Sequence, residues 1–293
     1  MELENIKKIL GLPFYENKYG LIYNMDCIEA MKILPPNVID ITFTSPPYNI
    51  GKAYENVMNV ESYVEWCYIW LKEIHRITKH DGSLWLNIGY LFLPHTGKAV
   101  PISYLLWNKT SFYLQQEIVW NYGAGVACKN MFSPRNEKIL WFVKDENNYI
   151  FNLDAIRDKN VKYPNQKKNG KLRCNTLGKN PSDVWQIAKV TSGKGRMSSE
   201  RTSHPAQTPV DLLDRVILGG SHEQNIVLDP FMGSGSTAIS AIKNNRRFIC
   251  FEIDRNYCKL AEKRIMSFIQ EREEPHEQLY LGNYILDSTI LSC

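Results

Sequence analysis

The fold is decided by residues 226–237, which read IVLDPFMGSGST. Residues 226–228 form a short apolar run that ends at Asp229 and is typical of a buried strand. Helical apolar spacing follows over residues 235–244. Glycines between the two let the backbone pass close to a ligand, and a helix N-terminus offers free N–H groups to a polar group. The stretch therefore predicts a strand, a ligand-binding loop and a helix.

Strands and helices alternate on both sides of this stretch. The predicted strands are 19–23, 38–43, 83–88, 116–121, 138–143, 226–229 and 248–252, with a turn at residues 81–82 before the third. The predicted helices are 27–34, 60–77, 100–107, 209–218, 235–244 and 257–271. Such alternation is typical of an α/β doubly wound sheet of the Rossmann type.

A carboxylate at the end of the following strand completes a predicted cofactor site. Glu252 ends the run 248–252, and a carboxylate there can accept hydrogen bonds from ribose hydroxyls. The loop lacks the Gly-Lys-Ser/Thr ending of a phosphate-loop NTPase. NAD binding stays open on these residues alone. Asp229 would repel a diphosphate, however, and it suits a cofactor that carries an amino-acid moiety and a sulfonium charge.

A second loop at a strand end supplies candidate catalytic groups. Residues 44–49 read TSPPYN and follow the predicted strand 38–43. Open α/β sheets place ligands outside the C-terminal ends of their strands. The prolines fix the backbone, and Tyr48 offers an aromatic face. A rigid turn with a packed tyrosine is the alternative, which two strand-end loops of complementary chemistry disfavour.

The segment 144–201 differs in composition from the rest of the chain. It is rich in Asn, Lys, Gly and Ser, and it holds 13 Lys+Arg against 6 Asp+Glu, whereas the whole chain has a net charge of +4. A basic segment on a slightly acidic body indicates a surface that faces phosphate. A solvated loop is the alternative interpretation.

Other features of the sequence exclude several classes of protein. No apolar run is long enough to span a membrane, and the N-terminus lacks the pattern of a secretory signal. Seven cysteines without a C-x-x-C pair indicate reduced thiols in a cytoplasmic protein. No His and Cys residues stand at metal-ligand spacing, so no metal site is expected.

Together these segments resemble the DNA amino-methyltransferases, whose signature is Asp/Asn/Ser-Pro-Pro-Tyr/Phe. The similarity covers roughly residues 19–269. Residues 229–237 fit the cofactor loop of that family throughout. Residues 247–257 are similar to the motif that follows, apart from Cys250, where a glycine is usual. Residues 204–209 resemble the motif that closes over the methionine part of the cofactor, apart from Thr208.

The order of the segments matches the beta class of that family, a circular permutation. The resemblance implies an S-adenosylmethionine-dependent methyltransferase domain with a catalytic half (1–143), a target-recognition insertion (144–201) and a cofactor half (202–272), followed by a tail (273–293). Its substrate would be double-stranded DNA in a restriction-modification system. A second copy of the chain and a cognate restriction endonuclease are the other partners considered.

The site residues follow from the same match. The predicted catalytic residues are Ser45, Pro46, Pro47 and Tyr48. The predicted cofactor-binding residues are Asp26, Cys27, His204, Pro205, Asp229, Pro230, Phe231, Gly233, Ser234, Gly235, Ser236, Thr237, Glu252 and Ile253. The predicted DNA-binding residues are Lys167, Lys168, Lys171, Arg173, Lys194 and Arg196. Tyr54 and Trp120 are further candidates for the pocket wall, although core packing is the stronger expectation for Trp120.

The chemistry of an exocyclic amine explains the catalytic segment. Its lone pair is delocalised into the ring, so acceptors for both N–H bonds are needed to direct it at the sulfonium methyl. The Ser45 hydroxyl and a backbone carbonyl can accept them. The base must leave the duplex to be reached, and Tyr48 can stack on it. Residues 55–57 (ENV) match a tripeptide of ring-carbon methyltransferases, but without their Pro-Cys dipeptide this match is treated as chance.

The choice of base rests mainly on the first residue of the signature. In the family, serine is associated with N4-cytosine methylation, and aspartate or asparagine with N6-adenine methylation. Ser45, with Ala206 in the His-Pro-Ala segment, favours N4-cytosine. N6-adenine stays the alternative because either side chain can accept an amino proton. A DNA-binding protein that keeps the fold without catalysis is a further alternative, which the intact signature disfavours.

Overall fold

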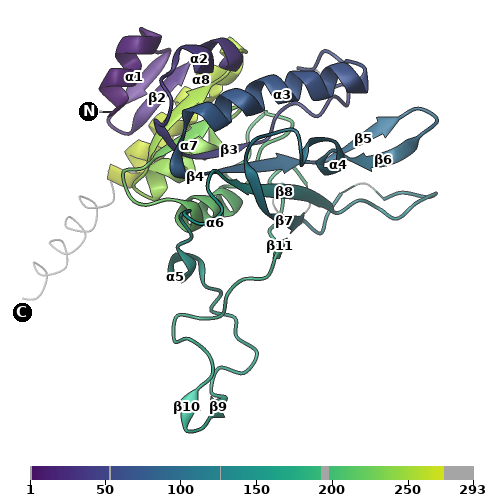
Figure 1. The fold of residues 1–293 in the computed structure, drawn as a ribbon, viewed down its shortest axis with the longest axis vertical. Helices are drawn as coiled ribbons and strands as arrows, with labels where there is room; N and C mark the ends of the chain where they lie inside the picture. Colours follow the sequence, from purple (N-terminus) through teal and green to yellow (C-terminus); the bar gives the residue numbers. More distant parts are fainter. Residues whose placement is uncertain (1, 53, 126, 193–197, 274–293) are drawn as a thin grey trace, which may run out of the picture.

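The structure, a computed structural model, describes residues 2–52, 54–125, 127–192 and 198–273. Its centre is a nine-stranded sheet with helices on both faces (Figure 1). The strand order is β1-β2-β13-β12-β3-β4-β8-β7-β11. These strands are β1 (Tyr15–Asn17), β2 (Gly20–Tyr23), β3 (Ile39–Thr44), β4 (Thr78–Ile88), β7 (Tyr113–Asn121), β8 (Asn136–Val143), β11 (Val184–Gln186), β12 (Ile226–Asp229) and β13 (Arg247–Phe251).

The middle of the sheet is parallel and its outer part is mixed. Neighbouring strands from β2 through β13, β12 and β3 to β4 run parallel. Strand β8 is antiparallel to both β4 and β7, and β11 is parallel to β7. Strands β3 and β12 are neighbours although they come from opposite ends of the chain, so both predicted loops start at the same edge of the sheet. The predicted α/β doubly wound fold is confirmed.

The helices form two layers. One face of the sheet is covered by α1 (Glu2–Leu10), α2 (Cys27–Ile33), α3 (Val60–Ile77) and α4 (Ser103–Leu106). The other is covered by α6 (Val210–Gly220), α7 (Ser236–Lys243) and α8 (Arg255–Glu273). Successive residues of a strand face opposite layers, as Val227 and Leu228 do. Strands covered on both faces are apolar at nearly every position, which explains the apolar run that begins the deciding stretch.

Some predicted elements are confirmed residue by residue. Helix α3 and strand β12 begin and end where they were predicted. Helix α3 starts after Asn59, whose side chain accepts a hydrogen bond from the Ser62 N–H at 2.8 Å. Such a cap satisfies an N–H group that has no partner inside the helix.

The predicted turn at residues 81–82 is wrong. Strand β4 already begins at Thr78 and runs through this segment, where its register against β3 shifts. The extra residues form a bulge, which keeps the strand continuous while changing its direction. A Cβ at Gly82 would lie 2.6 Å from the Asp40 carbonyl oxygen, so the glycine allows β3 to approach.

The predicted helix at 100–107 is shorter than expected. Its first residues belong to β6 (Gly97–Pro101), which pairs with β5 (Tyr90–Leu93) in an antiparallel hairpin. Only Ser103–Leu106 is helical. Strands β1 and β11 and this hairpin were not predicted, because each is short. Helix α1 was not predicted either, although its apolar residues recur at helical spacing.

The inserted segment has two parts. A finger projects away from the sheet and ends in the small hairpin β9 (Lys167–Lys168) and β10 (Lys171–Leu172) (Figure 1). After helix α5 (Leu153–Ile156) and this finger, β11 joins the main sheet, with Trp185 buried in its core. The boundaries 144–201 and 202–272 therefore stay predictions, and the tail beyond residue 273 lies outside the described residues.

Candidate active site

A cavity of about 700 Å³ lies at the C-terminal edge of the parallel strands. Both predicted loops contribute to its wall. The predicted residues that line it are Asp26, Cys27, Ser45, Pro46, Pro47, Tyr48, His204, Pro205, Asp229, Pro230, Phe231, Gly233, Ser234, Ser236, Thr237, Glu252 and Ile253. Tyr54 and Trp120 line it as well, and the Trp120 indole N–H also donates to the Ile187 carbonyl at 2.7 Å.

Gly235 supports the cofactor loop from behind instead of lining the cavity. It has φ +78°, and a Cβ there would lie 2.9 Å from the Cβ of Ala261 on α8. Gly233, with φ +54°, faces the imidazole of His204, whose Nε2 lies 2.8 Å from the position a Cβ would take. Both glycines are therefore required by conformation and by close packing. Cys250, the departure from the family pattern, is buried in the α6–α8 layer and does not line the cavity.

The Asp229 carboxylate connects the two loops. It accepts hydrogen bonds from the Thr237 hydroxyl at 2.6 Å and from the Thr44 hydroxyl at 3.1 Å. It also accepts one from the Phe231 N–H at 3.1 Å. Burial raises the pKa of Asp229 to about 7, although these hydrogen bonds oppose the shift. The carboxylate thus joins strand β3 to the start of α7, and its predicted contact with the cofactor stays a prediction.

Two more carboxylates border the cofactor side of the cavity. Glu252 accepts hydrogen bonds from the Gly233 N–H and the Asp254 N–H, each at 2.9 Å, and burial raises its pKa. Asp26 caps helix α2 by accepting from the Ile28 N–H at 2.8 Å. Both side chains line the cavity next to backbone N–H groups, an arrangement that suits a ligand with hydroxyl and amino groups.

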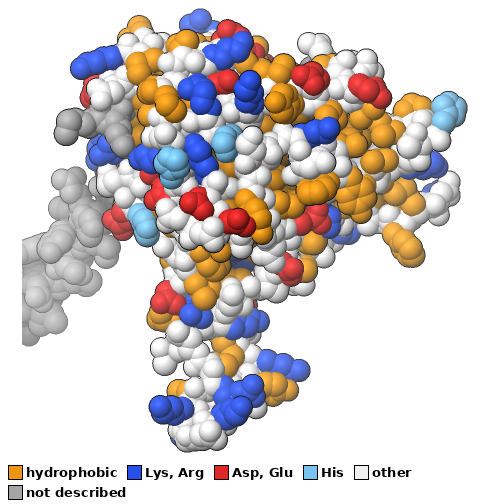
Figure 2. Space-filling view, viewed as in Figure 1, with side chains coloured by type: hydrophobic (Ala, Val, Ile, Leu, Met, Phe, Trp, Pro, Cys, Tyr) orange, Lys and Arg blue, Asp and Glu red, His pale blue; other side chains and the backbone are white. Residues whose placement is uncertain are grey.

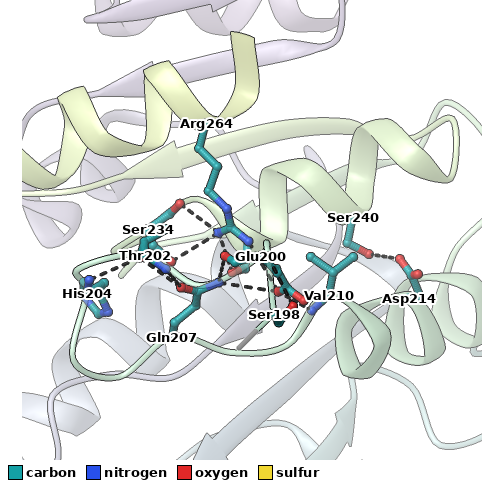
Figure 3. Close-up of polar contacts among 11 residues, drawn as sticks. Ser198, Glu200, Thr202, His204, Gln207, Val210, Asp214, Ser234, Ser240 and Arg264 are labelled. Atoms are coloured by element: carbon teal, nitrogen blue, oxygen red, sulfur yellow. Dashed lines mark hydrogen bonds and ion pairs between the residues drawn. The ribbon is translucent and has the colours of Figure 1, made fainter. Parts of the chain in front are cut away.

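The segment that contains His204 is fastened to the cofactor loop through Arg264 (Figure 3). This guanidinium donates to the Ser236 hydroxyl at 2.9 Å and to the Ser234 carbonyl at 3.1 Å. It also pairs with Glu200 at 3.3 Å. Glu200 in turn accepts from the Val210 N–H at 2.9 Å, where α6 begins. These contacts hold residues 200–210 against the loop on which a cofactor would lie.

His204 itself is held between aromatic rings. It stacks on Tyr54 with ring centroids 5.9 Å apart and meets the edge of Tyr257 at 4.5 Å. Burial, assisted by the charge of Arg264, lowers the pKa of His204 to about 4. The imidazole is therefore neutral at neutral pH and acts as part of the cavity wall.

The catalytic loop is shaped by Glu55. Its carboxylate accepts hydrogen bonds from the N–H groups of Tyr48 and Ile50, both at 2.8 Å, and of Lys52 at 3.0 Å. The Tyr63 hydroxyl donates to the Pro47 carbonyl at 2.9 Å. The match at residues 55–57 that was treated as chance therefore includes a residue that fixes the loop.

The hydroxyl of Tyr48 lies in a polar network that was not predicted. It is 2.9 Å from the Ser45 hydroxyl and 3.0 Å from Glu137 Oε2. The Asn87 side-chain N–H donates to Tyr48 at 2.9 Å and to Glu137 Oε2 at 2.8 Å. Lys189 pairs with Glu137 Oε1 at 2.5 Å. Burial, with the charge of Glu137 next in size, holds the pKa of Tyr48 well above its ordinary value.

Lys189 brings the inserted segment into the site. Its ammonium lies 3.8 Å from the ring centroid of Tyr122 and lines the cavity. The predicted DNA-binding residues lie elsewhere: Lys167, Lys168, Lys171 and Arg173 are exposed on the finger, where basic side chains gather (Figure 2). Lys194 and Arg196 lie outside the described residues. Their DNA contacts stay predictions.

The described residues contain neither a candidate metal site nor a membrane-spanning helix. In the ranges that the structure describes, no group of His, Cys, Asp and Glu could hold a metal ion. Within the same ranges, no helix is both long and apolar enough to cross a membrane.

Known proteins share both the sequence and the fold. The type II methyltransferase M.ScaI of Streptomyces caespitosus is 55% identical over 263 residues, which cover 90% of this chain and 86% of the relative. The DNA adenine methyltransferase YhdJ of Escherichia coli (strain K12) is 32% identical, covering 86% of this chain and 84% of that protein.

Solved structures agree with the fold. The cytosine-N4-specific PvuII DNA methyltransferase has a TM-score of 0.67 at 20% identity, covering 88% of this chain and 94% of that chain. The complex of M1.HpyAVI with SAM has a TM-score of 0.56 at 25% identity, covering 84% and 98%.

The family model described as DNA methylase, for the N6/N4 methyltransferases, matches residues 39–263. This range begins with the strand before the catalytic loop and ends inside α8, so it includes both loops and the network between them. The chain belongs to the N6/N4 family of DNA methylases.

Proposed function

We propose that this protein transfers a methyl group from S-adenosylmethionine to N4 of cytosine at a specific site in double-stranded DNA. The observation that carries the proposal is the placement of Ser45 and Tyr48 in the same cavity as the cofactor loop. We further infer that it is the modification enzyme of a restriction-modification system, acting in the cytoplasm, because the relatives include type II methyltransferases.

The residues of the cofactor side fit S-adenosylmethionine. Glu252 and Asp26 offer carboxylate oxygens to hydroxyl and amino groups, and Gly233 lets the His204 segment pack closely on the cofactor loop. The M1.HpyAVI structure is a complex with SAM. When bound, this cofactor supplies an electrophilic methyl group on a sulfonium. The chain's own residues hold it beside the catalytic loop and exclude other orientations.

The catalytic loop would prepare the target amine for attack. The Ser45 hydroxyl and a backbone carbonyl of the Ser-Pro-Pro segment accept its two N–H bonds, which turns the lone pair toward the methyl group. The new N–C bond forms as the S–C electron pair returns to sulfur. The methylated nitrogen is then positively charged, and it releases one proton to water. The chain supplies orientation and hydrogen bonds, and it forms no covalent bond with the base.

The shape of the cavity supports the binding of an extruded base. Tyr48 packs one side of its ring against Gly89, where a Cβ would lie 3.0 Å from the ring, and the residue lines the cavity. A base that leaves the duplex can stack on such a ring. Trp120 and Lys189 line the same cavity, with the Lys189 ammonium 5.4 Å from the Trp120 ring centroid. The exposed basic finger would bind the phosphates beside the target.

Ser45 favours cytosine over adenine as the target. Serine at this position is the feature that resembles N4-cytosine methyltransferases. Among the relatives, PvuII methyltransferase is cytosine-N4-specific and YhdJ is named an adenine methyltransferase. N6-adenine methylation is therefore the alternative, and the names of the relatives support both.

The test is direct identification of the product. Unmodified DNA is incubated with the protein and S-adenosylmethionine, digested to nucleosides and analysed by mass spectrometry. We expect N4-methyldeoxycytidine. N6-methyldeoxyadenosine would instead establish the alternative base, and the absence of any methylated nucleoside from DNA of varied sequence would overturn the activity. Single-molecule sequencing of the same DNA identifies the recognition site.

A further inference from the structure

The side-chain network behind Ser45 contains the carboxylate of Glu137, to which the proposed reaction assigns no role. Glu137 lies at the start of β8 and contacts Tyr48, Asn87 and Lys189 from inside the cavity wall. Its side chain is 14% exposed, and both of its oxygens have partners. A carboxylate so placed fixes the direction of the hydrogen bonds around it, because an ionised carboxylate only accepts.

The direction of each bond follows from counting donors. The Tyr48 hydroxyl has a single proton, and Ser45 Oγ, the Asn87 carbonyl and Glu137 Oε2 all lie within reach. The charged carboxylate is the strongest acceptor of the three, so the proton goes to Glu137. The Tyr48 oxygen can then only accept, and it receives the Ser45 proton across 2.9 Å.

This direction decides what Ser45 presents to a base. With its proton turned toward Tyr48, the Ser45 oxygen has two lone pairs. One can accept from the Asn87 side-chain N–H at 3.4 Å, and the other stays available to the cavity. Such an oxygen accepts a hydrogen bond from an amino group and has no hydrogen to offer to a keto oxygen. The opposite direction would place the Ser45 proton in the cavity, where it would oppose the N–H bonds of the target amine.

We propose that Glu137 is a positioning residue that makes Ser45 a hydrogen-bond acceptor, acting through the hydroxyl of Tyr48. The inference rests on the proposed amine methylation. Lys189 completes the arrangement because it occupies the other carboxylate oxygen and keeps Oε2 directed at Tyr48 and Asn87. A glutamine at this position could not serve both neighbours, since its single oxygen would face Lys189 and its N–H groups would meet the Asn87 donor.

The first experiment is a double-mutant cycle between Glu137→Gln and Tyr48→Phe, measured as single-turnover methylation of a duplex with the recognition sequence. Tyr48→Phe keeps the ring and removes the hydroxyl. We expect each variant to lower the rate roughly a hundredfold, and the double variant to lose little more than either alone. Independent losses that multiply would overturn the proposal, as would an unchanged rate in Glu137→Gln.

A second pair of variants separates hydrogen-bond direction from general damage. In Glu137→Gln with Lys189→Met, the glutamine oxygen is free to turn toward Tyr48 and Asn87. We expect Glu137→Gln to cost much less in the Lys189→Met background than in the wild type. An equal cost in both backgrounds would contradict the assignment.

The control is Glu117→Gln on the neighbouring strand β7, which removes a similar carboxylate. Glu117 pairs with Lys138 at 3.6 Å and does not line the cavity. This variant should methylate at the wild-type rate. Titration calorimetry with S-adenosylmethionine should give wild-type affinity for every variant, which shows that each is folded.

Two outcomes separate this proposal from the proposed function. A wild type that forms no methylated base refutes the proposed function itself. An active wild type whose single-variant losses multiply in the double variant refutes only the role of Glu137.

Discussion

The two sides of the cavity differ in the hydrogen bonds that hold their functional groups in place. On the cofactor side, carboxylates hold backbone N–H groups, as Glu252 holds Gly233 and Asp229 holds Phe231. On the side of the base, Glu55 also holds backbone N–H groups, but the hydroxyls of Ser45 and Tyr48 belong to a network of side chains that includes Glu137. Substitutions on the first side should therefore act through the conformation and stability of the loop. Substitutions in the side-chain network should act on the chemical step with little effect on folding.

The largest effect is expected for the pH dependence of stability at Asp229. Its pKa of about 7 lies above the ordinary value of 3.8, so the folded state binds the proton more tightly than the unfolded state. The stabilisation is complete below pH 4 and is lost as the pH rises toward 7. A shift of this size corresponds to about 4 kcal/mol.

Urea unfolding from pH 4 to 8 measures this effect, with Asp229→Asn as the reference because it does not titrate. The stability of the wild type should fall relative to the variant up to about pH 7 and then run parallel to it. A constant difference over the whole range would show that the carboxylate is charged in the folded state, and the contrast between the two sides would lose its main support.

The next effect concerns the opposite side of the cavity. Tyr48→Ala removes both the stacking ring and the relay to Ser45, so turnover should fall roughly a hundredfold or more. Affinity for S-adenosylmethionine, measured by calorimetry, should change less than about twofold. Comparable losses in turnover and in cofactor affinity would mean that the two sides do not act separately.

The sequence predicted one side of the cavity far better than the other, for a physical reason. Residues 229–237 are contiguous, and the glycines among them indicate the backbone conformation of a single loop. The network at Tyr48 joins residues that are 39 and 89 positions away, brought together only by the order of the strands. One signal was present: Asn87 is a polar residue in an otherwise apolar run, and buried polar side chains need partners. The partners themselves could be found only in the fold.

A smaller effect is expected at His204. The side chain packs on Gly233 and between two tyrosines without a charge, so His204→Ala should weaken cofactor binding about tenfold by loosening the loop. Because its pKa is about 4, His204 should add no titration between pH 6 and 8, so affinity should vary with pH in the same way in the wild type and in His204→Ala. Calorimetry at three pH values tests both statements, and a change in affinity near pH 6.5 that occurs in the wild type but not in His204→Ala would contradict a neutral imidazole.

The smallest effect is expected on the finger, which belongs to neither side of the cavity. Its exposed residues Lys168 and Lys171 lie on paired strands at the tip. If both contact phosphates, reversing the two charges should weaken DNA binding and lower the slope of log affinity against log salt by about 2. The chemical rate at saturating DNA should not change, since the finger is remote from Ser45 and Tyr48.

Fluorescence anisotropy at several salt concentrations measures the slope, with Lys8→Glu on α1 as the control. An unaltered slope would show that the finger does not contact DNA phosphates. The insertion would then reach the site through Lys189, a basic residue that lines the cavity.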